Sequence, residues 1–439
     1  MFGPTNKIMH ANSHSNIADN ELILKLKSFG LEELSKSLGF WQRKSGKISC
    51  CSLIMGCLSS LLSGQGSYSS WADRIGFLTN QTISKQAVSD RVNGSFCAVL
   101  QALVGRAIHA QNNACALELC GQYENVVLED STVLSLPERL HKFFPGNYSR
   151  GKRKAAAKLQ VAINITKGHV NHVHLTDFCE NDQSAAYQII EQLTPGTLVI
   201  RDLGYFVLGA MAEMQDKSID FITRYKHQAH LYNPQTNQQI DLVKLLQNRS
   251  ELKGKVRVGK RQAMEMTLVA VRLPKKVADE KRRKMKQNRD KRLNPSKQRL
   301  KLAEWNIFLT SVEPEKIQVQ DLVELYRIRW HIEMVFKSWK SVFKLHSLLP
   351  KQAVRPFQVK AIILLLMLYA IMIQLPLYFG TLGAKRCKVS LMKLSAFLRN
   401  FHVMDLPETT QKRYPYYTKV TQHGKRKRES MAHRILTLA

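Results

Sequence analysis

Acidic residues are scarce in this sequence. Its 439 residues include 34 Asp and Glu against 66 Lys and Arg, which leaves a formal net charge of +32 at pH 7. This shortage argues against a cationic partner and favours a polyanion, of which nucleic acid is the commonest large one. A membrane surface is the weaker alternative. The hydrophobic content of 44% is ordinary, so the chain can build two or three domains with a sizeable core.

Paired cysteine motifs are absent from the sequence. Its eight cysteines are scattered and form no Cys-x-x-Cys pair, which favours reduced thiols in a cytoplasmic protein. The opening stretch "MFGPTNKIMHANSHSN" also lacks the apolar core of a signal peptide.

Long uncharged runs are rare in this sequence, and one of them could be either a membrane span or a buried helix. Residues 361–384 carry no charged side chain and are long enough to span a bilayer. Gln374 and Pro376 interrupt the run, however, and its most apolar part, "AIILLLMLYAIMI", is short for a membrane span. We therefore expect a buried helix packed against a sheet and no membrane association.

Residues 1–120 read mostly as helix, and we expect them to form a helical DNA-binding domain. Within them, "TISKQAVSDRVNGSF" (82–96) resembles a helix-turn-helix recognition element, with Ser84 as the cap and Ser89 on a polar face. A plain short amphipathic helix is the alternative.

The pattern changes after residue 120, where apolar runs typical of strands alternate with helical ones. These runs are 125–136, 159–166, 169–178, 183–193 (helical), 197–206, 207–215 (helical) and 218–226. The order β-β-β-α-β-α-β predicts an α/β fold with a mixed sheet over 121–226.

Residues 227–304 break this pattern and predict a β-rich, basic insertion. Its stretch 275–301 holds thirteen Lys or Arg against three acids, a natural surface for phosphates, although a solvated helix face would have the same composition. Residues 305–380 return to the α/β pattern of 121–226, with the strand "WNIFLTSV" and a long helix from about 320 to 343, and we expect them to complete the same core. We expect 381–439 to be a basic C-terminal region that contacts DNA.

Two acids occupy positions that are costly unless the acids are paired or bind metal. Asp130 lies within an apolar strand, and Asp202 ends another just before Gly204. A lone acid at a strand end is usually a cap or turn residue, but two on one sheet with a third from a helix can hold two divalent cations for phosphoryl transfer. Spacing alone does not choose Asp130 over Glu129, because neighbouring residues point to opposite faces of a strand.

The stretch "YRIRWHIEMVFKSWK" (326–340) supplies the third acid. At about 100° per residue, Tyr326, Arg329, Glu333 and Lys340 fall within about 60° of one another on a single helix. This stripe suits a metal-binding Glu333 whose basic neighbours hold phosphates, with surface salt bridges as the alternative. Trp330 borders this stripe, and we expect it to have a structural or void-filling role. Trp339 faces away from the stripe, and we expect it to pack in the core.

The spacing Tyr-x2-Arg-x3-Glu-x6-Lys resembles the signature of the insertion-sequence-4 family of DDE transposases. The contexts "EDSTVL" around Asp130 and "DLGYF" at Asp202 resemble the two family aspartates, and the resemblance covers about residues 120–375. It implies an RNase H-like core with a β-rich insertion between the second Asp and the Glu.

The resemblance also implies roles for individual residues. Asp130, Asp202 and Glu333 are expected to bind two Mg²⁺, for which Mn²⁺ can substitute. Tyr326, Arg329 and Lys340 are expected to contact DNA phosphates. Trp305 resembles a family tryptophan that stacks on a flipped base, although a core tryptophan is an equal alternative.

These expectations point to a cut-and-paste DNA transposase of a bacterial insertion sequence. Its partners would be double-stranded DNA with terminal inverted repeats, target DNA and a second copy of the chain in a synaptic homodimer. An RNase H-like nuclease or resolvase is the enzymatic alternative, and a transposase-derived repressor without catalysis is the other.

Overall fold

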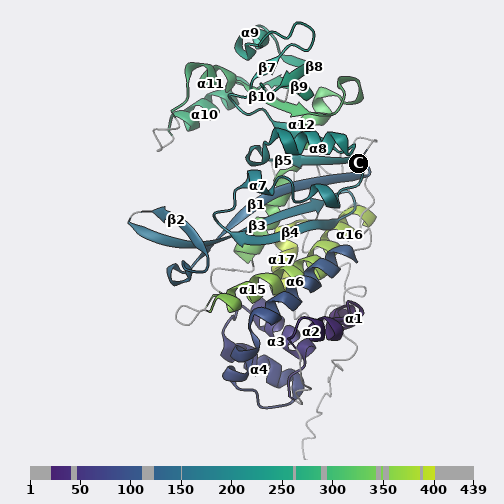
Figure 1. Cartoon of the computed structure of the whole chain (residues 1–439), viewed down its shortest axis with the longest axis vertical. Helices are drawn as coiled ribbons and strands as arrows, with labels where there is room; N and C mark the ends of the chain where they lie inside the picture. Colours follow the sequence, from purple (N-terminus) through teal and green to yellow (C-terminus); the bar gives the residue numbers. More distant parts are fainter. Residues whose placement is uncertain are drawn as a thin grey trace, which may run out of the picture.

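The computed structural model describes residues 21–40, 47–110, 123–149, 151–260, 264–287, 294–342, 348–349, 355–385 and 389–400. Figure 1 shows N-terminal helices at one end of an elongated molecule, a sheet in the middle and a β-rich region at the other end. The regions 1–20 and 401–439, including the expected C-terminal DNA contact, lie outside the described residues.

Helices alone form the described part of the first 110 residues. They are α1 (Glu21–Ser28), α2 (Leu31–Ser37), α3 (Cys50–Leu62), α4 (Tyr68–Thr79), α5 (Lys85–Arg91) and α6 (Gly94–His109). Ser84 caps α5 as predicted, since its hydroxyl accepts the Ala87 N–H at 3.1 Å. Ser89 does not face solvent as expected; it is buried because α5 packs against α4. DNA contact by this segment remains a prediction.

A large mixed sheet forms the centre of the molecule. Its order is β2-β3-β1-β5-β6-β10-β9-β8-β7, with β4 paired to β3. The strands are β1 (Asn125–Leu136), β2 (Pro145–Ser149), β3 (Lys152–Asn164), β4 (His169–Asp177), β5 (Thr197–Arg201), β6 (Asp220–Arg224), β7 (Leu231–Tyr232), β8 (Glu251–Val258), β9 (Met264–Arg272) and β10 (Trp305–Thr310). Strands β1, β5 and β6 run parallel, whereas β3 is antiparallel to β1. The predicted mixed α/β fold is therefore confirmed.

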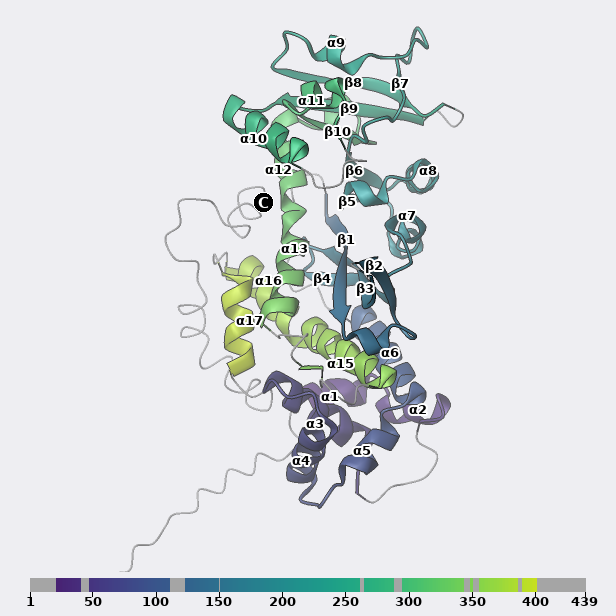
Figure 2. The same ribbon diagram turned by 90° about the vertical axis from the view of Figure 1, so that its left-hand side faces the viewer.

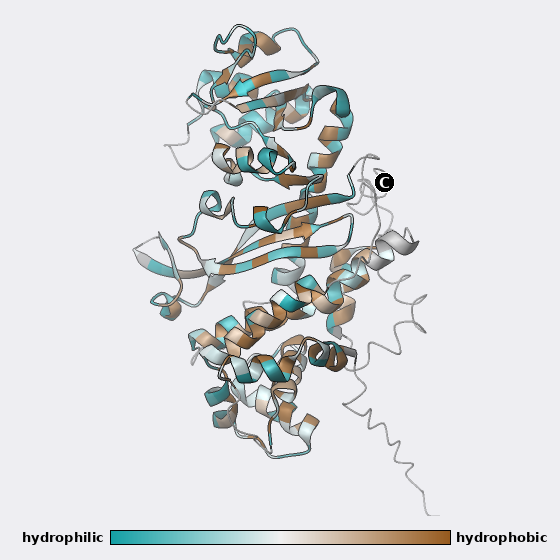
Figure 3. Cartoon of the chain, turned by 45° about the vertical axis from the view of Figure 1, so that its right-hand side comes forward, coloured by the Kyte–Doolittle hydropathy of each residue, from teal (hydrophilic) through white to brown (hydrophobic). Residues whose placement is uncertain are grey.

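The two faces of the sheet belong to different cores. Along β1, Val126 and Leu128 join a core with the N-terminal helices, whereas Val127 joins a second core with α8 (Leu208–Asp216). Figure 3 shows hydrophobic and hydrophilic residues interspersed along these strands. This period of two decides which side each polar residue of β1 faces.

The strands of the expected insertion continue the central sheet instead of forming a separate unit. β9 pairs with β10, β8 with β9, and β7 with β8. The basic stretch forms α10 (Lys275–Lys286) and α11 (Lys297–Leu302), which lie beside these strands in Figure 2. The region also contains the short α9 (Leu242–Leu246).

Two predicted helices differ from expectation. The run 183–193 forms only α7 (Asp182–Ala185) and a 3-10 turn (Ile190–Gln192). The helix predicted over 320–343 is divided into α12 (Val319–Ile328), α13 (Trp330–Lys337) and a π-helical turn (Ser338–Val342). Bonds of the i to i−3 type on either side of Arg329 tighten the backbone between α12 and α13.

The uncharged run is a buried helix, as predicted, but its main neighbours are helices. It comprises α15 (Pro356–Tyr369), a π-helical turn (Ala370–Gln374) and α16 (Leu375–Lys385), and α15 packs mainly against α6 and α3. Because α15 is apolar on all sides, it needs cover from several elements rather than from one sheet face. Residues 356–379 are long and apolar enough to cross a membrane, yet 83% of the most apolar window is buried inside the protein. The chain is completed by α17 (Leu391–Asn400).

Candidate active site

Three acidic residues reach the same place from three different elements. Asp130 comes from β1, Asp202 directly follows β5, and Glu333 belongs to α13. Because β1 and β5 are parallel neighbours, the carboxyl end of β5 lies beside the middle of β1. Helix α13 packs on β1, which brings Glu333 to the same face.

A single guanidinium joins the three carboxylates. Arg329 Nη1 donates to Asp130 Oδ2 at 3.0 Å, and Nη2 donates to Glu333 Oε1 at 2.6 Å. The Arg329 Nε atom lies 3.9 Å from Asp202 Oδ1. The Arg329 side chain is 10% exposed, whereas those of Asp202 and Glu333 are 44% and 37% exposed. The acids therefore open to solvent on one side and share one cation.

The electrostatics of Asp130 show how unfavourable an isolated charge is here. Burial raises the pKa of Asp130 to about 6, although Arg329 and the Ser131 N–H act in the opposite direction. The negative charges of Asp202 and Glu333 raise this pKa further. Such a cluster favours any additional positive charge between the carboxylates.

The donor set suits a hard divalent cation. Carboxylate oxygens are the side-chain ligands that Mg²⁺ and Mn²⁺ prefer. Within the described residues, no group of three or more Asp, Glu, His or Cys side chains is arranged to bind one metal ion. The Arg329 guanidinium instead fills the space between the acids, so a metal ion would take over its role as the shared cation.

The two faces of the sheet separate Glu129 from Asp130, and Asp130 is the one that lies on the side of Glu333. Glu129 points away from α13, and its Oε2 lies 2.5 Å from Arg201 Nε in a fully buried ion pair. Burial raises the pKa of Glu129 to about 7, with Arg201 opposing the shift. Sequence reasoning missed this pair, although Arg201 is a charged residue in the buried strand beside Asp202 and is the register partner of Glu129.

The predicted stripe of DNA-contacting residues is only partly on the surface. Tyr326 is 4% exposed and packs between Phe308 and the Arg224 guanidinium. Lys340 lies in the π-helical turn, where the 100° step used for the prediction no longer holds. Their DNA contacts remain predictions.

Of the two tryptophans in the 326–340 stretch, one differs from expectation and one agrees with it. Trp330, which follows Arg329 in the chain, is 57% exposed and so does not fill a void. Trp339 anchors its helix as predicted, because its Nε1 donates to the buried Gln374 at 3.0 Å.

Trp305 begins β10 and is 6% exposed, which fits the core alternative better than an exposed stacking surface. The Arg272 guanidinium lies over its ring, and both residues line a cavity of about 330 Å³. This cavity gives access to the indole.

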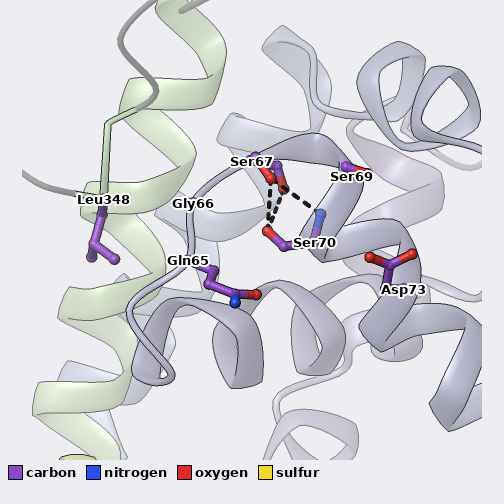
Figure 4. A pocket seen from close by; sticks show the side chains of 7 residues that line it. All are labelled: Gln65, Gly66, Ser67, Ser69, Ser70, Asp73 and Leu348. Atoms are coloured by element: carbon purple, nitrogen blue, oxygen red, sulfur yellow. Dashed lines mark hydrogen bonds between the residues drawn. The ribbon is translucent and has the colours of Figure 1, made fainter.

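A further cavity of about 500 Å³ lies between the N-terminal helices and Leu348 (Figure 4). Three serines line it, and the Ser67 and Ser70 hydroxyls bond to each other at 2.9 Å. None of the predicted site residues lines this cavity, so it is separate from the three acids.

Known proteins resemble this chain over most of its length. Residues 122–371 match the family model described as a transposase DDE domain. The transposase for insertion sequence element IS231D of Bacillus thuringiensis subsp. finitimus is 25% identical over 342 residues, which cover 72% of this chain and 71% of that protein. The transposase for IS231B of Bacillus thuringiensis subsp. berliner is 24% identical over 368 residues, which cover 74% and 73%.

Two further matches have lower coverage or lower identity. The transposase for IS1151 of Clostridium perfringens is 24% identical over 304 residues, 63% of each chain. Among solved structures, the piggyBac transposase synaptic complex with hairpin DNA is 9% identical, with a TM-score of 0.45 over 94% of this chain and 87% of that one.

Proposed function

The chain belongs to the DDE-domain transposases, and from this membership we propose that it moves an insertion sequence by cut-and-paste transposition through Asp130, Asp202 and Glu333. The observation that carries the proposal is the convergence of these three acids, from β1, the end of β5 and α13, on one guanidinium. The surrounding strands β1, β3, β4, β5 and β6 would form an RNase H-like core. The partial exposure of Asp202 and Glu333, 44% and 37%, supports access by a large substrate.

Two divalent cations held by Asp130, Asp202 and Glu333 would activate the attacking oxygen and stabilise the leaving oxygen. Mg²⁺ is the proposed ion, with Mn²⁺ as a substitute. Arg329 would then turn its guanidinium toward a phosphate of the DNA, for which its planar fork is suited. Trp330, which follows Arg329 in the chain and is 57% exposed, would support the same strand.

The reaction would consist of two kinds of phosphoryl transfer. Hydrolysis at the transposon end breaks a phosphodiester and leaves a free 3′-hydroxyl. That hydroxyl then attacks a second phosphodiester, either across the duplex to give a hairpin or directly in target DNA, and displaces a DNA oxygen. The same three acids would serve both transfers.

DNA recognition would be shared by the regions that flank the acids. The helices before residue 120 and the basic helices α10 and α11 would bind duplex DNA with the terminal inverted repeats in a synaptic homodimer in the bacterial cytoplasm. Trp305 would receive an extruded base through the cavity that it lines with Arg272 and Lys301. Tyr326 would orient Arg329, whose guanidinium lies 6.0 Å from its ring centre.

Cleavage of the element's own ends tests the proposal. With Mg²⁺ and a duplex bearing the terminal repeats, we expect cutting at the repeat boundary. Asp130→Ala, Asp202→Ala and Glu333→Ala should each lower the rate by about 1,000-fold or more, as expected for groups on which the chemistry depends. Asp216→Ala, which removes an exposed acid at the end of α8, is the matched control.

The alternatives predict different outcomes. Cutting that ignores the repeat sequence would indicate a general nuclease or resolvase. Binding of the ends without any cutting would indicate a repressor. Full activity in any of the three acid variants would contradict the proposed site.

A further inference from the structure

The face of the sheet opposite the three acids carries a cluster of polar side chains that includes none of the proposed site residues. Helix α7 lies on the side of the sheet away from α13 (Figure 2), and Asp182, its first residue, contacts β1 and β3. Three donors from these strands converge on its Oδ1 atom. They are Ser131 Oγ at 2.9 Å, Lys158 Nζ at 3.2 Å and Gln160 Nε2 at 3.2 Å.

One branch of this cluster leads to the first catalytic aspartate. Ser131 follows Asp130 on β1, so its hydroxyl points to Asp182 while Asp130 points to the active site. The Ser131 N–H donates to Asp130 Oδ1 at 2.8 Å. By fixing Ser131, Asp182 fixes the backbone amide that orients the Asp130 carboxylate.

A second branch leads to the turn that carries Asp202. Gln160 accepts a hydrogen bond from the hydroxyl of Tyr205, and both side chains are buried. The Tyr205 N–H donates to the Asp202 carbonyl at 3.1 Å, which closes the turn after β5. The position of this turn therefore depends on Gln160, which is itself held by Asp182.

Gly204 in the same turn shows how closely Asp182 approaches. A Cβ at Gly204 would lie 2.9 Å from Asp182 Oδ2, closer than real Cβ contacts. The carboxylate has little freedom to retreat, because its other oxygen is held by three donors. The glycine of "DLGYF" is thus required by Asp182.

We propose that Asp182 is a positioning residue that sets the geometry of both Asp130 and Asp202, through Ser131 and through Gln160 and Tyr205. This inference rests on the proposed function, because it assigns the two aspartates to one metal-binding site. Groups behind metal ligands typically change metal affinity or activity about 10–100-fold when they are removed.

The test compares Asp182→Asn and Asp182→Ala with Glu191→Gln, which neutralises an exposed acid close by in the sequence. Mn²⁺ binding is measured by electron paramagnetic resonance, end binding by gel shift in EDTA, and folding by thermal melting. We expect Asp182→Ala to weaken Mn²⁺ binding and to slow end cleavage about 10–100-fold. Asp182→Asn, which keeps an acceptor oxygen, should have a smaller effect, and end binding in EDTA should not change.

A double-mutant cycle distinguishes positioning from general stabilisation. If Asp182 acts through Ser131, Ser131→Ala should slow cleavage in the wild-type background but add little to Asp182→Ala. Unchanged Mn²⁺ affinity in both Asp182 variants would overturn the inference. The inference would also be overturned if Asp182→Asn lost end binding in EDTA to the same extent as it lost cleavage. Asp182 would then support the structure in general.

The inference and the proposed function fail in different ways. If wild-type protein does not cut transposon ends, the proposed function fails while Mn²⁺ binding still reports on Asp182. If the wild type cuts and the Asp182 variants bind Mn²⁺ normally, only the positioning role fails.

Discussion

Arg329 balances three carboxylates with one side chain, and this role has consequences for metal binding. A unit positive charge within 4 Å of the acids repels an incoming cation, while the acids left without it would repel one another. We propose that Arg329 occupies the place of a metal cation between the carboxylates, and we expect its guanidinium to become available to DNA when metal binds.

Arg329→Gln tests this exchange at the scale of one residue. We expect Mn²⁺ to bind the DNA-free variant about 3–10-fold more tightly, because a competing charge is gone. Stability in EDTA should fall by about 1–3 kcal/mol, as for partners left unsatisfied, and Mn²⁺ should restore it. Cleavage should still decrease, since a phosphate contact is lost. Arg327→Gln, on the exposed side of α12, is the control, and equal Mn²⁺ affinity in all three proteins would contradict the exchange.

Helix α10 uses its basic residues in two ways. Lys281 donates to the Trp305 carbonyl at 2.9 Å, and Arg282 pairs with Glu304, so Lys281 and Arg282 attach the helix to the rest of the protein. Arg282 also pairs with Asp279 within the helix. The remaining cations are exposed and include Lys275, Lys276, Arg283, Lys284 and Lys286. The composition of the stretch did not reveal this division, because it depends on which face meets β10.

Charge reversal on the outer face of α10 tests DNA binding by this element. Lys276→Glu/Arg283→Glu should weaken binding to any duplex and lower the slope of log affinity against log salt by about 2, one for each lost phosphate contact. Melting temperature should stay near that of the wild type, because neither side chain docks the helix. Lys244→Glu/Arg249→Glu, exposed elsewhere in the same region, has the same charge change. An equal loss of affinity in that control would indicate a general effect of net charge.

At the scale of the whole molecule, local signals predicted the convergence of the three acids better than they predicted what surrounds them. Asp130 and Asp202 stand out because an acid within or beside apolar sequence is costly, and Glu333 stands out because it shares one helical stripe with Arg329 and Lys340. The burial of Tyr326 and Trp305 could not be predicted from local signals. A helical wheel or strand pattern shows which residues share a face, but it does not show which other elements pack on that face. Likewise, β9 pairs with the edge of β10, and β8 and β7 then extend the central sheet. This pairing depends on tertiary structure, which the local sequence pattern does not reveal.

The separation between the acids and α10 leads to a prediction about the assembled complex. In Figure 1 the β-rich region with α10 lies at one end of the molecule and the N-terminal helices at the other, and β1 and β5 lie between them. Asp130 belongs to β1, and Asp202 directly follows β5. A synaptic dimer could therefore hold each DNA end on one protomer and cut it with the other. Glu333→Ala would supply DNA binding without chemistry, and Lys276→Glu/Arg283→Glu would supply chemistry with weak binding. At a salt concentration where each variant alone is inactive, their mixture should recover cleavage, measured on paired ends, if cutting occurs in trans. Failure of the mixture to cut, while mixed dimers form on the DNA, would show that each protomer cuts the end that it binds.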